Sequence, residues 1–163
     1  MENNSIFLTI KAAFVAFAGA FSAAFGWLGW LILAWVGCMV LDWISGSAAA
    51  AAQGNWSSAV ARAGIWHKGG MIVVVLVAAV ADCVLGMAVE HLPALDIEYT
   101  VLVLPVILVW YIFTELGSIA ENATDMGAPV PAWLTKLLAA GKKMAENQID
   151  ISEDTDTAGD NKK

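Results

Sequence analysis

The stretch from residue 12 to residue 41, AAFVAFAGAFSAAFGWLGWLILAWVGCMVL, contains no Asp, Glu, Lys or Arg. As one α-helix it would be about 45 Å long at ~1.5 Å per residue, whereas the hydrocarbon core of a bilayer is ~30 Å thick. The block is therefore either one tilted helix with an overhang or a hairpin that turns within 25–30. Gly26 and Gly29 provide backbone freedom for a turn, and Trp27 and Trp30 suit a membrane–water interface. We favour the hairpin, with helices over 5–25 and 27–44.

The composition of the whole chain agrees with this membrane assignment. Of its 163 residues, 60% are hydrophobic and 14% are charged, and the mean hydropathy is +0.71. Soluble domains average ~45–50% apolar and ~25% charged residues. A globule of this size has too little interior to bury so many apolar side chains. An ordinary soluble enzyme is thus excluded, and an integral membrane protein is predicted.

Two further apolar segments predict additional spanning helices. Residues 69–89 contain Asp82 as their only charged residue, and a third segment runs from about Tyr99 to Ser118. Pro105 is tolerable there as a kink in a spanning helix. The predicted fold class is all-α, an integral membrane bundle of three or four transmembrane helices.

The polar segments divide the chain into five units: an apolar block (1–44), a connector (45–68), two further spans (69–120), a Gly/Pro turn with an amphipathic helix (121–145) and a tail (146–163). In the connector we expect a short surface helix followed by a turn near residues 53–58. The amphipathic helix, over 132–144, has apolar side chains on one side and could lie on the membrane surface. The acidic tail is poor in apolar residues and is predicted to be disordered.

The distribution of positive charge predicts the orientation. Arg62 and Lys68 lie in the connector, and Lys136, Lys142 and Lys143 follow the last span, whereas 90–98 contains three acids and no Lys or Arg. The connector and the C-terminus are therefore expected in the cytoplasm. A hairpin start places the N-terminus there too, and a single first helix places it outside. The first residues do not resemble a cleavable signal peptide, because they lack a basic region and the apolar stretch is too long.

Stripes of small residues mark two candidate helix-packing faces. Small residues at a spacing of four let helices approach closely in lipid. The first face serves either self-association in an oligomer or packing within one protomer, and it comprises Ala12, Ala16, Ala20 and Ala24. The second comprises Ala78, Asp82 and Gly86.

Two acids within the spans are candidates for a functional role, since a carboxylate in hydrocarbon costs ~2.5–3.5 kcal/mol on insertion scales and normally faces protein or water. Asp82, near the middle of its span, is either a pore-facing or proton-sensitive group or a hydrogen-bonded packing residue. Asp42 lies near the expected cytoplasmic end of its helix and could reach interfacial water.

No pattern predicts catalysis, a metal, a cofactor or nucleic-acid binding. His67 and His91 are separated by a whole span, and Ser57 and Ser58 lack a His/Asp partner pattern. Both cysteines lie inside apolar runs, where they behave as small hydrophobes. The Lys and Arg residues form no stripe that could follow a phosphate backbone. We therefore expect neither an enzyme nor a nucleic-acid partner.

Two local patterns carry a resemblance to a known family. The first is Leu41-Asp42-Trp43-Ile44-Ser45-Gly46, followed by Gly54-Asn55-Trp56-Ser57-Ser58 and by Lys68; the second is Glu115-Leu116, Glu121-Asn122, Gly127, Pro129 and Pro131. Over roughly residues 41–138 the chain resembles the phage-lysis and toxin-secretion holin family of small membrane proteins. It departs from that family at Lys68, where relatives often have more lysines. The matching motif residues are Asp42, Gly46, Ser58, Lys68, Glu121, Asn122, Gly127, Pro129 and Pro131.

The resemblance implies a function that composition does not. Holins accumulate in the bacterial cytoplasmic membrane, form homo-oligomers in the lipid bilayer, and open lesions that release a peptidoglycan-degrading endolysin. In some relatives the released protein is a large toxin. The alternatives are a non-lytic export channel for a folded protein and a membrane adaptor that recruits a partner. We expect the Gly/Pro unit to end the last span and orient the amphipathic helix at the cytoplasmic surface.

Overall fold

A computed structural model describes residues 2–91 and 101–147, and over these ranges the chain is helical without strands. Its five helices are α1 (Glu2–Phe25), α2 (Trp27–Ala52), α3 (Ser58–His91), α4 (Val103–Asp125) and α5 (Ala132–Asn147). The helices α1 to α4 are each long and apolar enough to cross a membrane. The predicted all-α membrane fold is confirmed, with four candidate spans.

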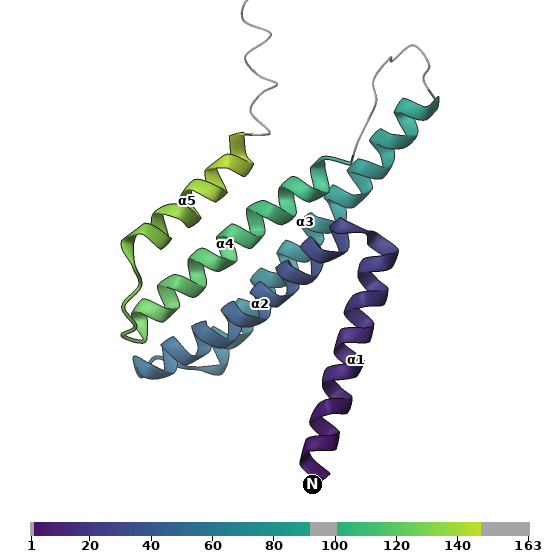
Figure 1. Ribbon diagram of the computed structural model, residues 1–163. Helices are drawn as coiled ribbons and strands as arrows, with labels where there is room; N and C mark the ends of the chain where they lie inside the picture. Colours follow the sequence, from purple (N-terminus) through teal and green to yellow (C-terminus); the bar gives the residue numbers. More distant parts are fainter. Residues whose placement is uncertain (1, 92–100, 148–163) are drawn as a thin grey trace, which may run out of the picture.

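Gly26 is the whole junction between α1 and α2. Its φ of +62° lies in the left-handed region, which favours glycine because a Cβ would clash there. The turn expected within residues 25–30 therefore consists of one residue between the two helices. The amide of Gly29 donates to the Gly26 carbonyl at 3.1 Å. Beyond the junction α1 and α2 diverge instead of lying side by side (Figure 1). Within the described residues, α1 contacts only α2.

The helices α2, α3 and α4 form the packed bundle (Figure 1). Its centre is Leu108 of α4, whose side chain is fully buried, and Trp35 of α2 stacks on Tyr111 of α4 with ring centroids 6.1 Å apart. Around them lie Met39, Met71, Val75, Ala78 and Leu104. α5 returns antiparallel along α4 and packs against it (Figure 1).

The connector differs from the expectation. α2 does not end near residue 44 but continues to Ala52, because the alanine run has the highest helix propensity. Gly54, with φ +72°, ends it, and the amides of Gly54 and Asn55 bond back to the carbonyls of Ala51 and Ala50. This is a Schellman motif. The expectation of a separate surface helix before residue 53 was therefore wrong.

The helix that carries the next span begins before the expected span at 69–89. α3 begins at Ser58, so residues 58–68 are its first turns. Charged residues set the expected boundary, but a helix need not end where the bilayer ends. α4 begins at Val103, later than expected, and this places Pro105 in its first turn, where the missing amide costs no helical hydrogen bond and no kink follows. Tyr99 lies outside the described residues.

A second Schellman motif ends α4. Gly127 has φ +88°, its amide donates to the Thr124 carbonyl at 2.8 Å, and the Ala128 amide donates to the Ala123 carbonyl at 3.0 Å. The turn closes at Pro131, whose carbonyl accepts from the Leu134 amide at 2.9 Å in the first turn of α5. α5 includes residues 146 and 147, and the predicted disorder beyond them falls outside the described residues.

Candidate functional site

An ionic cluster joins α2, α3 and α4 near the ends that carry the 53–57 and 126–131 turns. The ammonium of Lys68 on α3 donates to Asp42 Oδ2 on α2 at 2.9 Å and to Glu115 Oε2 on α4 at 2.5 Å. The side chains of Lys68, Asp42 and Glu115 are 14%, 21% and 5% exposed. Three helices are therefore held at one point by two ion pairs.

Amide and hydroxyl groups extend this cluster. Asn122 Nδ2 on α4 donates to Asp42 Oδ1 and to Ser45 Oγ, both at 3.0 Å, and Ser45 Oγ donates to the Asp42 carbonyl at 3.1 Å. Gly46 of α2 lies beside this amide, because a Cβ at this position would be in van der Waals contact with Asn122 Nδ2 at 3.4 Å. We call Asp42, Ser45, Lys68, Glu115 and Asn122 the polar network.

The charges of the polar network do not cancel. One ammonium faces two carboxylates, which leaves a formal net charge of −1 among three largely buried groups. Charges in a low-dielectric interior attract strongly, but they also carry a large desolvation cost that only well-paired geometry offsets. Each charged group is bonded to another network member, so the arrangement locks three helices together and depends on every partner remaining in place.

Asp82 lies in a separate site at the other end of the bundle. Its Oδ1 accepts from the amides of Leu102 and Val103 at 3.2 and 2.9 Å, and its Oδ2 accepts from Leu104 at 2.7 Å. Only 6% of Asp82 is exposed. The first amides of a helix lack intrahelical acceptors and carry the positive end of the helix dipole. Asp82 of α3 therefore caps α4, which is the hydrogen-bonded packing alternative considered from the sequence.

The small-residue stripes have different surroundings. Ala78 is buried in the bundle core, and Gly86 is half-buried. By contrast, Ala12, Ala16, Ala20 and Ala24 of α1 are all exposed. Packing inside the protomer does not use the α1 face in the described structure, and its self-association stays a prediction.

The structure brings together some of the motif residues and leaves others apart. Asp42, Gly46, Lys68 and Asn122 meet at the polar network. Ser58 begins α3, Glu121 is exposed on α4, and Gly127, Pro129 and Pro131 form the turn after α4. His67 lies near the start of α3 and His91 at its end.

The sequence reasoning missed Glu115 as a member of the site. Glu115 is part of the second family pattern, but that pattern assigns it no partner. A useful signal was its spacing of seven from Asn122, which puts both on one face of α4 after two turns. A second signal was Lys68, which directly precedes the predicted span at 69–89. A lysine this close to hydrocarbon needs a counter-charge.

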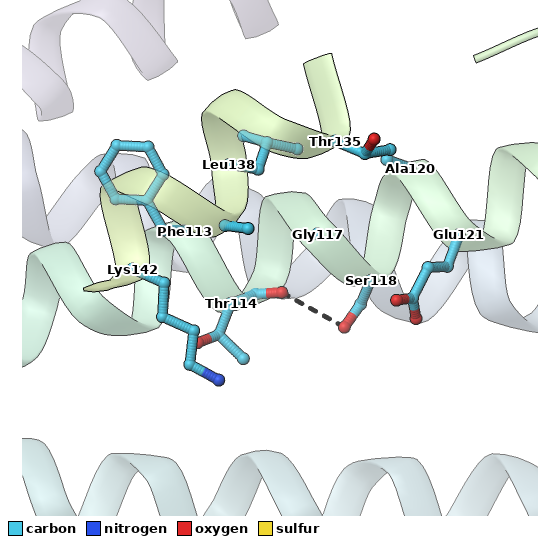
Figure 2. Close-up of a pocket in the computed structure, with 10 residues that line it drawn as sticks. Phe113, Thr114, Gly117, Ser118, Ala120, Glu121, Thr135, Leu138 and Lys142 are labelled. Carbon is cyan, nitrogen blue, oxygen red and sulfur yellow. Dashed lines mark hydrogen bonds between the residues drawn. The ribbon is translucent and has the colours of Figure 1, made fainter. Parts of the chain in front are cut away.

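α5 adds a second contact region, against α4. Figure 2 shows the pocket between them, of about 280 Å³, which is lined by Phe113, Thr114 and Glu121 of α4 and by Leu138 and Lys142 of α5. The Ser118 hydroxyl donates to the Thr114 carbonyl at 3.3 Å (Figure 2). At the far end of α5, Lys142 lies 4.7 Å from the Trp110 ring centroid and Glu146 accepts from Trp110 Nε1 at 2.9 Å. α5 therefore packs along α4 and does not stand apart as a separate surface helix.

Together these features define a multi-pass membrane protein whose helices are joined by buried polar groups. The sequence model of the bacteriophage holin family matches residues 19–143, and the chain belongs to this family. It is also 37% identical over 95 residues to an uncharacterized protein of Halalkalibacterium halodurans, covering 58% of this chain and 65% of that relative. The chain thus spans slightly less than two thirds of the relative's length. No solved structure matches it significantly.

Proposed function

We propose that this protein is a holin that oligomerises in the bacterial cytoplasmic membrane and permeabilises it, releasing an endolysin during phage lysis. The family match over residues 19–143 carries the proposal, because it includes most of the helical bundle and α5. The relative from Halalkalibacterium halodurans is uncharacterized, so it gives no further support for a particular activity.

The distribution of polar and apolar groups supports this function. The outer faces of α1 and α3 are largely exposed and apolar, as lipid contact or contact with further copies requires. The exposed alanine stripe of α1 is suited to close approach of a second copy. The polar network supplies charged side chains between the spanning helices, which could face water once protomers separate their helices around a lesion.

We further propose that the 53–57 turn and the 126–131 turn face the cytoplasm. The two turns lie at the same end of the bundle (Figure 1). Arg62 and Lys136 follow these turns closely in the chain, and cytoplasmic segments carry an excess of such residues. The C-terminus is then cytoplasmic, next to the pool of soluble enzyme to be released.

Inducible expression beside a cytoplasmic endolysin tests the lytic function. We expect loss of membrane potential followed by release of endolysin activity and a fall in culture turbidity. Induction without either change contradicts the proposal. Release of the co-expressed protein from cells that stay viable identifies a non-lytic export channel instead, whereas a monomer that leaves liposomes sealed identifies an adaptor.

A further inference from the structure

A small pocket opens beside the polar network, between the first turns of α3 and the last turns of α2. Its volume is about 180 Å³, and its lining includes Asp42 and Trp43 of α2, Gly64, His67 and Lys68 of α3, and Trp56 of the intervening turn. Ligand pockets are typically ~300–1,000 Å³. The space therefore suits a small fragment better than a whole metabolite.

An apolar groove of about 330 Å³ adjoins this pocket along the same pair of helices. Trp43 and Lys68 line both spaces, and the groove continues past Val40 and Val36 of α2 and past Ile72 of α3. Position 36 precedes position 47 of the pocket lining by 11 residues along α2, or about 16 Å of helix. The groove thus runs from the turn end of the bundle toward the middle of two spanning helices.

This order of surfaces matches the order of groups in a phospholipid. The pocket beside the polar network lies at the end where Trp43 and Trp56 suit a membrane interface, and the apolar groove runs from there along the two spanning helices. A soluble ligand has no use for a groove open to hydrocarbon. The geometry therefore favours a lipid over a soluble ligand.

The charges around the pocket select the headgroup. Lys68 is already shared between two carboxylates, so the cluster against which the pocket lies carries a formal net charge of −1. Asp42, 21% exposed, can accept further hydrogen bonds from a primary ammonium. Trp43 and Trp56 also line the pocket, and the face of an indole ring attracts a cation. His67, also on the lining, offers a ring nitrogen to the neighbouring phosphate.

We infer that the seam between α2 and α3 binds one phospholipid with an ethanolamine headgroup, its ammonium at Asp42 and its chain along Val40 and Ile72. Native mass spectrometry of the whole protein in mild detergent tests this against added lipids of identical chains. We expect ethanolamine phospholipid to bind about tenfold more tightly than choline phospholipid, because trimethylation removes a charge-assisted hydrogen bond. Glycerol phospholipid, which lacks the ammonium, should also bind more weakly.

A matched pair of substitutions locates the site. Gly64→Leu fills the pocket, because a Cβ at Gly64 already lies 3.7 Å from Trp43 Cδ1. Ala63→Leu adds the same side chain at an exposed neighbouring position. We expect Gly64→Leu to abolish the preference for ethanolamine and Ala63→Leu to keep it. Trp56→Ala, in the turn, provides a second variant if Gly64→Leu does not fold.

Several results would overturn the inference. Equal binding of the three phospholipids shows that no headgroup is selected, and preferred binding of the glycerol lipid shows that the charge argument is wrong. An unchanged preference in both Gly64→Leu and Trp56→Ala shows that the lipid binds elsewhere. Binding of free phosphoethanolamine as tight as that of the lipid shows that the groove contributes nothing.

Discussion

Lys68 shows how one residue can determine the packing of three helices. Its ammonium is the positive charge of the polar network, and both of its carboxylate partners come from other helices. Removing one member of a buried ion pair leaves the other charge uncompensated, which is far costlier than removing the whole group.

We therefore expect Lys68→Met to destabilise the bundle strongly, by about 3–5 kcal/mol. The triple substitution Asp42→Asn, Lys68→Met and Glu115→Gln leaves no buried charge and should recover most of that loss. Unfolding in detergent, followed by circular dichroism, measures both. If Lys68→Met is as stable to unfolding as the wild type, the polar network does not hold the three helices together.

Asp82 is the other single residue with a defined structural task. We expect Asp82→Ala to loosen the first turn of α4 by about 1–2 kcal/mol, the usual cost of a lost helix cap. Asp82→Asn retains one acceptor oxygen and should lose less. Hydrogen exchange of the Leu102, Val103 and Leu104 amides reports the change directly. Unaltered exchange of these amides in Asp82→Ala contradicts the capping role.

The sequence predicts which helices exist more accurately than where each helix begins and ends. The apolar segments correctly indicate the helices of the bundle, and the alternation of apolar and polar residues correctly indicates α5. Charged residues misplaced the start of α3, because Lys68 is paired inside the bundle and does not mark its boundary. The partners of Asp42 lie 26 and 80 positions away in the chain, and no local pattern reports such pairs.

The place of α5 also depends on a contact that periodicity does not reveal. Gly141 faces the Phe113 ring so closely that a Cβ would overlap it. We expect Gly141→Val to separate α5 from α4 and Ala140→Val, at an exposed neighbouring position, to leave it packed. Faster hydrogen exchange along α5 in the first variant only is the expected result. Equal exchange in both variants shows that close approach at Gly141 is not required.

For the whole molecule, four spans and a cytoplasmic C-terminus require both chain ends on one side. In a background with Cys38 and Cys83 replaced by serine, single cysteines at Ser5, Gln53 and Thr135 should resist an impermeant thiol reagent in intact cells. A cysteine at His91, the end of α3, should react. Reaction at Ser5 but not at Gln53 shows instead that α1 does not cross the membrane with α2.

The single-residue junction at Gly26 also affects how freely the amino-acid sequence of α1 can change. Substitutions in α2, α3 or α4 must satisfy neighbours on two or three sides, so most changes there are constrained by a shared interior. Within the described residues, α1 contacts only α2. The family match begins at residue 19, so it leaves out most of α1. Its exposed face can therefore change its residues without disturbing the bundle, so that the partners of α1 can diverge while the interior of the protomer stays the same.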